Sequence, residues 1–348
     1  MKTHTRMLAL TLALALCLTL CACHRNPAAD TGVSEIPPAL APTEPTTVER
    51  EHATVYGLVG PTGVGLADLM HRNEQKSSAL DYTICLATSP EEIVGKLTTG
   101  EANFAALPTN LAATLYQKTD GAVQVLALNT GCVLYIVENG NSIHSIADLK
   151  GKTVLSTGEG ANPEYIFRYL LSENGLDPDS DVTLDFVAEN DELAAALVSG
   201  NADVALVPEP LCSTVLAKNA DLRVALSLGD EWINAQNGAA PYMGCIVVNA
   251  QYAVDLPGNV EAFLSDYKVS VEAAQTNVKA VAGWCEQYGI IGSAAIAEQA
   301  IPRCAITCVT GKGMAPFLDP YLSVLFTADP KSVGGALPDE GFYYEGFH

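Results

Sequence analysis

Positive charge is scarce in this sequence, which has 18 Lys and Arg against 40 Asp and Glu among its 348 residues. The formal net charge is therefore −22 at pH 7. Such an acidic balance disfavours binding to nucleic acid and to anionic lipid, and it favours solubility. We predict no nucleic-acid partner.

Motifs of catalytic centres are also missing. The chain contains no G-x-S-x-G, H-E-x-x-H or paired C-x-x-C string, and its first glycine loop lacks the lysine of a P-loop. The six histidines avoid the glycine loops and stand at positions 4, 24, 52, 71, 144 and 348. We therefore expect no enzyme, no metal and no other cofactor.

A disulfide framework is not indicated, although ten cysteines occur. Three of them lie at or before residue 23, which leaves seven, an odd number, in the rest of the chain. Most of the seven sit in apolar runs such as DYTICLA, where a free cysteine behaves as a small buried hydrophobe. Cys304 and Cys308 could pair or help to bind a metal, but no nearby histidine completes a zinc signature.

The first 22 residues have the composition of a secretory signal peptide. Two cations precede an apolar run over residues 7–20 that is too short for a spanning helix, and their removal with the signal leaves a net charge of −24. The run ends in LCAC, which resembles the bacterial lipobox, so Cys23 is the expected lipidation site. Cys21 is a weaker candidate because a bulky leucine precedes it, and ordinary cleavage near Ala22 is the alternative.

Residues 23–52 follow as a segment rich in proline, threonine, alanine and acid. The segment has no apolar periodicity and buries too little surface to offset the entropy of ordering it. We predict a lipidated, disordered tether, which its prolines bias toward extended geometry. The tether would hold a globular body, starting near Ala53, outside the cytoplasm and anchored to the bacterial cell membrane by the lipid alone.

An internal repeat indicates the architecture of that body. Residues 89–118 align with residues 189–218 without a gap, at an offset of one hundred. Each copy predicts a helix closed by a glycine, then a short buried strand, then a proline and another helix. The segments before the copies, TVYGLVG with PTGVGLADL and KTVLSTG with EGANPEYIF, both predict a strand, a glycine loop and a helix. Two βαβαβ halves follow from this, with a cleft between them.

The predicted fold class is α/β, with two lobes built on open, mainly parallel sheets. About 295 residues are too many for one ordinary domain, which also favours two lobes. We place lobe 1 at residues 53–140 and 242–348 and lobe 2 at residues 141–241. The strand YMGCIVVN at residues 242–249 would bring the chain back, and two crossing strands form a hinge.

Several stretches together resemble a known family. These are GPTGVGLADL, AALPTNLAATLY, DLKGKTVLSTGEGANPEY, ALVPEP and the C-terminal IPRC and PKSVGGALPDEGFYY. With them the chain resembles solute-binding lipoproteins of ABC transporters that have the type II periplasmic-binding-protein fold. Within these, it is similar to the group of receptors for sulfonate, nitrate and taurine and for a thiamine pyrimidine precursor.

Two glycine loops supply the first candidate ligand contacts. Thr62 and Gly63 open a helix whose free N–H groups suit an acceptor-rich ligand, although a tight turn alone would also require glycine. The equivalent loop of the second half offers Gly160 and Asn162, with Asn162 as the cap of the next helix. Glu159 could instead be a solvated loop carboxylate.

The repeat supplies further candidates at equivalent strand ends. Thr109 and Asn110 follow the strand in the first copy, and Glu209 replaces Thr109 in the second. A carboxylate there suits an amine or amidine-like nitrogen, and Glu209→Gln would then weaken binding about tenfold. Thr130, beside the crossing strand, completes the predicted site. Further candidates are Met243 and Trp232, of which Trp232 can equally be packing.

The resemblance implies a transport function. We expect a monomeric, extracytoplasmic receptor that closes on a small solute, sulfonate-, nitrate- or taurine-like or pyrimidine-like, and docks on an ABC permease. No Lys or Arg lies in the candidate loops, which argues mildly against a doubly charged anion. One alternative is a ligand-sensing ectodomain that signals through a membrane partner. Another is a pyrimidine-synthesis enzyme that sacrifices its own histidine, which the absence of histidine from the loops disfavours.

Overall fold

The computed structural model describes residues 50–346. The predicted signal peptide, the lipidation site Cys23 and the tether up to residue 49 lie outside the described residues. Folded structure begins slightly before the predicted Ala53, because Arg50 donates to Ser78 Oγ over 2.8 Å and pairs with Asp81 at 3.1 Å. No helix within residues 50–346 is long and apolar enough to cross a membrane.

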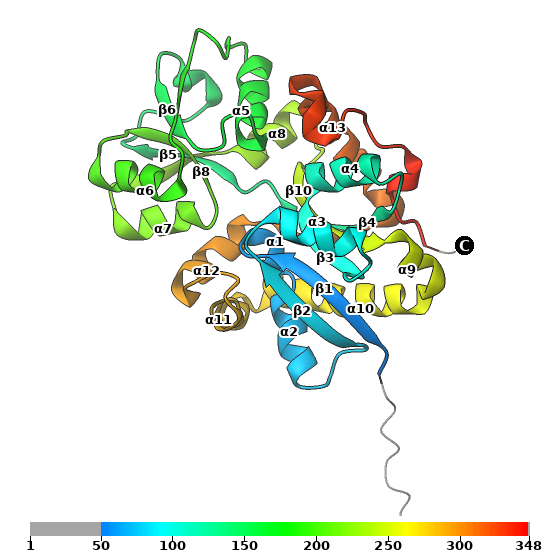
Figure 1. Cartoon of the computed structure of the whole chain (residues 1–348). Coiled ribbons are helices and arrows are strands. Elements are labelled where there is room, and N and C mark those ends of the chain that lie inside the picture. The colour runs from blue at the N-terminus through cyan, green and yellow to red at the C-terminus, as the bar shows by residue number, and fades with distance from the viewer. Residues whose placement is uncertain (1–49, 347–348) are drawn as a thin grey trace, which may run out of the picture. The chain divides into compact units, whose positions relative to one another are not determined.

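Two sheets organise the chain, and each groups with its own helices in Figure 1. The first sheet has six strands in the order β11-β4-β10-β3-β1-β2. Its strands are β1 (His52–Leu58), β2 (Asp81–Ala87), β3 (Phe104–Pro108), β4 (Val123–Gly131), β10 (Tyr242–Asn249) and β11 (Ile306–Thr310). The helices that follow these strands are α1 (Pro61–Val64), α2 (Ala67–Glu74), α3 (Pro90–Thr98), α4 (Thr109–Lys118), α9 (Ala250–Asp255), α10 (Pro257–Thr276), α11 (Val278–Tyr288), α12 (Ala294–Ala300) and α13 (Ala315–Ala328).

The second sheet has five strands in the order β7-β6-β8-β5-β9. Its strands are β5 (Leu134–Asn139), β6 (Thr153–Ser156), β7 (Thr183–Phe186), β8 (Val204–Pro208) and β9 (Leu222–Ser227). Its helices are α5 (Asn162–Glu173), α6 (Asn190–Ser199), α7 (Leu211–Lys218) and α8 (Leu228–Ala235). Short 3₁₀ turns complete the described chain: η1 (Ile146–Leu149), η2 (Ile301–Arg303), η3 (Gly311–Gly313), η4 (Pro330–Val333) and η5 (Glu340–Phe342).

The structure confirms the repeat element by element. Helices α3 and α6, strands β3 and β8, and helices α4 and α7 occupy equivalent positions one hundred residues apart. Gly100 and Gly200, which follow the first helix of each copy, have φ angles of 74° and 75°. Glycine reaches this left-handed region without a steric penalty, which explains why both copies end the helix with it.

Both sheets are mixed, and their antiparallel strands are those near the crossings. Strands β1, β2 and β3 are parallel, as are β6, β7 and β8, whereas β10 runs antiparallel to β3 and β4, and β5 runs antiparallel to β8 and β9. A strand that enters from the other sheet needs no crossover helix and can pair antiparallel. Because β5 pairs in the second sheet, the chain first passes between the sheets at residues 131–134, before the predicted position near residue 140.

Apolar side chains cover both faces of the central strands. Neighbouring residues such as Val55 and Tyr56 on β1, or Phe104 and Ala105 on β3, belong to different core clusters because successive side chains point to opposite faces. All four are buried, so the six-stranded sheet is covered on both sides here. This pattern explains the unbroken apolar runs in the sequence.

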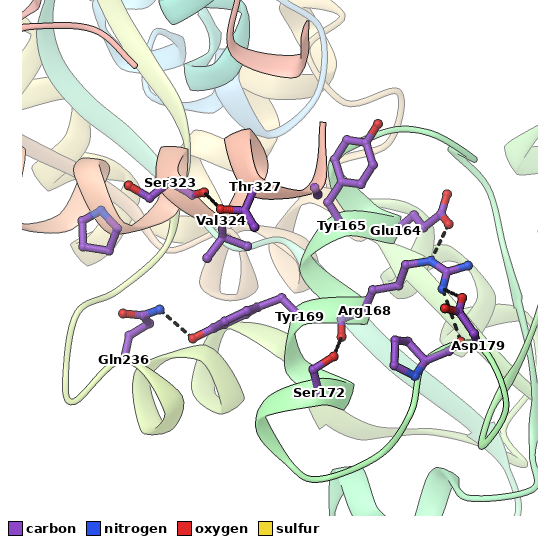
Figure 2. Close-up of a pocket in the computed structure, with 13 residues that line it drawn as sticks. Glu164, Tyr165, Arg168, Tyr169, Ser172, Asp179, Gln236, Ser323, Val324 and Thr327 are labelled. Carbon is purple, nitrogen blue, oxygen red and sulfur yellow. Dashed lines mark hydrogen bonds and ion pairs between the residues drawn. The ribbon is translucent and has the colours of Figure 1, made fainter. Parts of the chain in front are cut away.

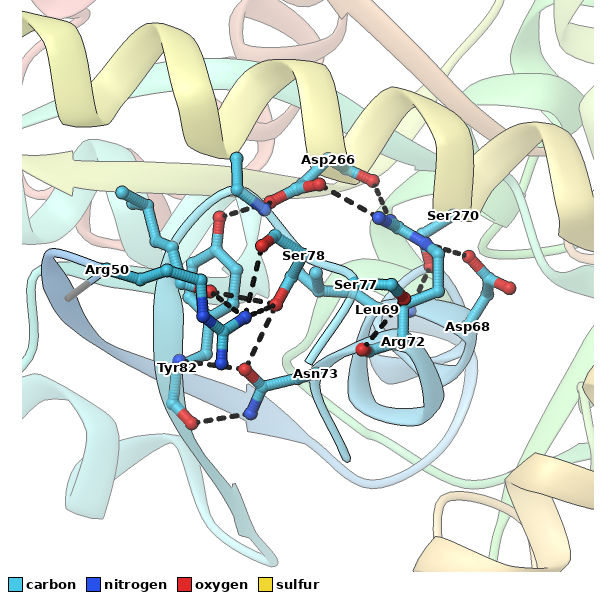
Figure 3. A network of polar contacts seen from close by, with 12 residues as sticks. Arg50, Asp68, Leu69, Arg72, Asn73, Ser77, Ser78, Tyr82, Asp266 and Ser270 are labelled. Carbon is cyan, nitrogen blue, oxygen red and sulfur yellow. Dashed lines mark hydrogen bonds and ion pairs between the residues drawn. The ribbon is translucent and has the colours of Figure 1, made fainter. Parts of the chain in front are cut away.

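A polar network connects α2, α10 and the edge strand β2 beside the apolar core (Figure 3). The Asp266 carboxylate on α10 accepts hydrogen bonds from Arg72 at 2.8 Å, from the Ala79 N–H at 2.7 Å and from the Tyr82 hydroxyl at 2.9 Å. Arg72 also pairs with Asp68 at 2.7 Å. Each buried charge therefore has a partner, which offsets the cost of taking it out of water.

Candidate functional site

A cavity of about 520 Å³ lies between strand ends of the two sheets. Six of the eight predicted ligand residues line it, three from each half of the chain's repeat: Thr62, Asn110 and Thr130 from the six-stranded sheet, and Gly160, Asn162 and Glu209 from the five-stranded one. Parallel strands carry their loops at the carboxyl edge, which explains why positions so distant in sequence meet here.

The first glycine loop enters the cavity through Thr62, while Gly63 lies behind it. Gly63 is buried, and a Cβ on it would come within 2.4 Å of the Leu58 carbonyl oxygen. Glycine is therefore required here by the tight turn between β1 and α1. The carbonyl of Thr62 accepts a hydrogen bond from Asn129 Nδ2 at 3.2 Å, which ties the loop to β4.

Thr109 does not reach the cavity and is a structural residue. Its side chain is fully buried, and its hydroxyl donates to the Tyr242 carbonyl at 2.9 Å. The predicted ligand contact at Thr109 is therefore not supported, because the hydroxyl already connects α4 to the returning strand β10. Pro108, not Thr109, is the N-cap of α4.

Asn162 and Asn110 meet across the cavity. Asn162 Nδ2 donates to Asn110 Oδ1 at 2.9 Å and lies 3.3 Å from the Tyr321 hydroxyl of α13. Asn162 was expected to cap α5, but the N-cap is Ala161 and Asn162 is the first helical residue. Its amide is thus free of helix capping and connects the start of α5 with α4 and α13.

Glu209 has its polar partners inside the protein. Its side chain is 0% exposed and accepts hydrogen bonds from the Ser213 N–H at 3.1 Å and the Ser213 hydroxyl at 3.0 Å. Arg303 Nη1 lies 3.4 Å from the same carboxylate. Burial raises the pKa of Glu209, and the Ser213 hydrogen bonds and Arg303 partly oppose that rise. A merely solvated role for the Glu209 carboxylate is therefore ruled out, and direct contact with a ligand stays a prediction.

The sequence analysis missed the C-terminal contribution to the cavity. Asp329, Lys331 and Ser332, on and beside η4, line it. The Ser332 carbonyl accepts a hydrogen bond from Asn110 Nδ2 at 3.3 Å, which holds η4 against α4. Lys331 supplies a cation from outside the candidate loops, which themselves contain no Lys or Arg. Its only signal was the C-terminal stretch PKSVGG, which has no counterpart in the repeat.

Met243 and Trp232, the two further candidates, lie in different surroundings. Met243 lines the cavity beside Gly244 on β10. Trp232 is fully buried, and its ring centroid lies 4.9 Å from that of Tyr169 and 5.7 Å from that of Tyr321. Trp232 therefore packs in the core between α5, α8 and α13, as the alternative interpretation proposed.

Metal-binding and disulfide chemistry have no visible basis in residues 50–346. Within this range no group of three or more His, Cys, Asp or Glu side chains is arranged to hold a metal ion. The seven cysteines of the range are free thiols, five of them buried. Their burial agrees with the predicted role as small hydrophobes.

The sequence was compared with family models and with proteins of curated function. Residues 75–231 match the family model described as the periplasmic phosphonate-binding, substrate-binding protein of an ABC transporter. A search by sequence among proteins of curated function finds no match.

Solved structures resemble the whole folded chain. An ABC transporter protein from Parabacteroides distasonis is 23% identical, with a TM-score of 0.70, and the match covers 84% of this chain and 98% of that one. The periplasmic aliphatic sulphonate-binding protein SsuA from Escherichia coli is 14% identical, with a TM-score of 0.67, over 85% of this chain and 93% of that one. The alkanesulfonate-binding protein SsuA from Xanthomonas axonopodis pv. citri, bound to MOPS, is 15% identical, with a TM-score of 0.57, over 84% and 96%.

These matches confirm the resemblance predicted from the sequence. The likeness in fold extends over both sheets, whereas the family model spans the middle of the chain. The folded chain therefore has the two-lobed α/β fold of these solute-binding proteins, and residues 75–231 are similar to a substrate-binding family of ABC transporters.

Proposed function

We propose that the protein is the extracytoplasmic, lipid-anchored receptor of an ABC importer and binds a small organic solute between its two sheets. The observation that carries this proposal is the convergence of six predicted residues on one cavity. A cavity of about 520 Å³ is within the size range of small-molecule sites. The chain would bind and deliver rather than catalyse, as a monomer that contacts a permease.

The two lobes are proposed to move about the crossings between the sheets. Their extents follow the sequence analysis, residues 53–140 with 242–348 and residues 141–241, with β5 adjusted to the lobe of the five-stranded sheet. Few strands cross between the sheets, and a few residues at such crossings can absorb the change in angle. The hydrogen bond between Asn162 and Asn110 already joins the two sides of the cavity, so opening about the crossings would break it to admit the solute.

The cavity is lined by one cation, Lys331, and two carboxylates, Asp329 and Glu209, and it is the position of the cation that favours an organic anion such as a sulfonate or phosphonate. Lys331 supplies a cation, and the Gly160 loop lies before the N-terminus of α5, where the helix dipole favours negative charge. The only carboxylate expected to bind a ligand nitrogen, that of Glu209, is occupied by Ser213 and Arg303. A pyrimidine-like solute is the second candidate, and it would have to compete with these partners.

Mass spectrometry of small molecules released from the purified protein, followed by calorimetry with those found, tests this proposal. We expect an organic anion, whose binding Lys331→Gln weakens by about tenfold, as the loss of a charge-assisted hydrogen bond implies. The matched control is Lys279→Gln, because Lys279 is exposed on α11 and lies outside the cavity. Equal affinity of both variants and the wild type for the anion would remove it from this cavity.

A further inference from the structure

A second cavity of about 770 Å³ extends along α5, on the side that faces α13. Figure 2 shows Tyr165, Tyr169 and Ser172 on α5 opposite Val324 and Thr327 on α13. We call this cavity the α5–α13 groove. It lies outside the set of residues predicted from the sequence, and its size alone is sufficient for a small organic group.

The groove and the cleft cavity meet at Tyr165, which lines both. The Tyr165 hydroxyl donates to the Gly160 carbonyl at 2.7 Å, so the ring is held at the border between the two cavities. On the opposite wall, Thr327 and Ala328 at the end of α13 line the groove, and the next residue, Asp329, lines the cleft cavity. The two cavities are thus adjacent, and the Tyr165 side chain and Asp329 lie at the border between them.

Apolar surface and paired charges characterise the groove. The rings of Tyr165 and Tyr169, Pro320, Val324 and Ala328 give it an apolar lining. The guanidinium of its one cation, Arg168, is bound by Glu164 at 2.6 Å and by Asp179 at 2.8 Å. An anionic head group therefore finds no unpaired cation in the groove, whereas Lys331 is available in the cleft cavity.

Helix geometry sets the length of a ligand that would occupy both cavities. Asn162 lines the cleft cavity and Ser172 lines the far end of the groove, ten positions later on α5. At about 1.5 Å of rise per residue, the two positions are roughly 15 Å apart along the helix axis. A compact solute with only a head group would leave this length unused.

We propose that the α5–α13 groove is a second subsite, which holds the extended apolar tail of a solute whose anionic head lies in the cleft cavity. The inference rests on the proposed function and specifies its substrate class as an elongated, amphipathic organic anion. The head would contact the Lys331 side of the cleft, and the tail would pass Tyr165 and lie between Tyr169 and Val324. The shared wall at Tyr165, which the tail would have to displace, favours part of the same ligand over an independent partner.

Calorimetry with methane-, butane- and octanesulfonate tests the subsite. Each methylene group that leaves water contributes about 0.8 kcal/mol, which corresponds to about a fourfold lower dissociation constant. We therefore expect affinity for the wild type to increase steadily along the series. Thr327→Trp would fill the groove, and the ratio between the methanesulfonate and octanesulfonate constants should then fall toward one.

A matched variant separates groove blocking from a general effect of a new tryptophan. Thr327 and Thr276 are both exposed, both lie at a helix end, and each hydroxyl donates to the carbonyl four residues earlier, at 2.8 Å and 2.7 Å. Thr276→Trp on α10 should preserve the wild-type ratio, because Thr276 lines neither cavity.

The outcomes distinguish this inference from the proposed function. If all three sulfonates bind with equal affinity, or if Thr327→Trp preserves the ratio, the groove is not a tail subsite, although the cleft proposal stands. If no sulfonate binds the wild type, the sulfonate form of the proposed function fails and the tail subsite fails with it. A ratio lost equally in Thr327→Trp and Thr276→Trp would also overturn the groove assignment.

Discussion

Arg303 and Glu209 form an ion pair with an N–O distance of 3.4 Å. The pair connects the part of the molecule built on the six-stranded sheet with the part built on the five-stranded sheet. Glu209 follows β8 of the five-stranded sheet, whereas Arg303 belongs to η2, just before β11 of the six-stranded sheet. The Arg303 carbonyl also accepts a hydrogen bond from the Tyr135 hydroxyl on β5 at 2.6 Å. The pair thus lies beside the first crossing and buries a carboxylate whose one ion-pair partner within residues 50–346 is Arg303.

Removing Arg303 should destabilise the fold by leaving that carboxylate buried without a cation. We expect Arg303→Gln to lower the free energy of unfolding by about 3 kcal/mol at pH 7, in line with broken buried pairs. Adding Glu209→Gln should restore most of the loss, because no uncompensated charge then remains. Urea denaturation of the two single variants and the double variant measures the coupling. Additive losses would show that the two side chains do not interact.

The raised pKa of Glu209 predicts a specific pH dependence of stability. A carboxyl whose pKa is higher in the folded state than its usual value of about 4.3 binds more protons when folded, so its contribution falls as pH rises. The stabilising contribution is fully present below about pH 4.3. It disappears as the pH rises through the raised pKa of the folded state. Relative to Glu209→Gln, the wild type should therefore lose stability between pH 4 and 7.

Denaturation of both proteins across that pH range measures the effect. Glu189→Gln, at an exposed position just before α6, is the control for a general change of one charge. A difference between wild type and Glu209→Gln that stays constant with pH, or that grows in favour of the wild type, would contradict the dominance of burial over Arg303 and Ser213.

The Asp266 network should support stability without taking part in solute binding. Asp266→Ala leaves Arg72, the Ala79 N–H and the Tyr82 hydroxyl without their common acceptor. We expect a loss of about 3 kcal/mol in the free energy of unfolding and an unchanged dissociation constant for the solute. Asp255→Ala, at an exposed position on α9, should cost far less. A weakened affinity in folded Asp266→Ala would mean that this network also shapes the cleft.

Cys23 is predicted to carry the lipid anchor. Replacing it with alanine should release the protein from the membrane fraction, because no other lipid attachment is expected and the tether is polar. Cell fractionation combined with labelling by a radioactive fatty acid measures both properties. Cys21→Ala is the matched control and should retain label and membrane attachment. Full membrane retention of unlabelled Cys23→Ala would overturn the anchor.

The internal repeat explains why so much of the fold could be predicted. Local patterns mark α3, β3 and α4, and the offset of one hundred predicts their counterparts together with Gly100 and Gly200. The first crossing was harder to place, because VQVLALNTGCVLYIVENG has two mostly apolar runs separated only by NTG. The structure divides it between β4 and β5 at residues 132 and 133, directly after Gly131.

The limits of the site prediction have a common physical cause. Strand-end loops can be recognised in a sequence by their glycine and proline residues, which is why Thr62 and Asn162 were found. Lys331 reaches the cavity only because η4 packs on α4, and Arg303 reaches Glu209 across nearly one hundred residues. Such long-range contacts leave no periodicity in the sequence. The same applies to Thr109, whose partner Tyr242 belongs to the returning strand.

The most direct test of the account is whether filling the cleft cavity abolishes solute binding. Asn162→Trp would place a large ring at a position that lines the cavity, whereas Glu159→Trp adds the same ring at an exposed loop position that does not line it. With the anion released from the purified protein, calorimetry on folded samples should detect no binding to Asn162→Trp and wild-type affinity for Glu159→Trp. Wild-type affinity in Asn162→Trp would place the solute elsewhere and contradict the central claim.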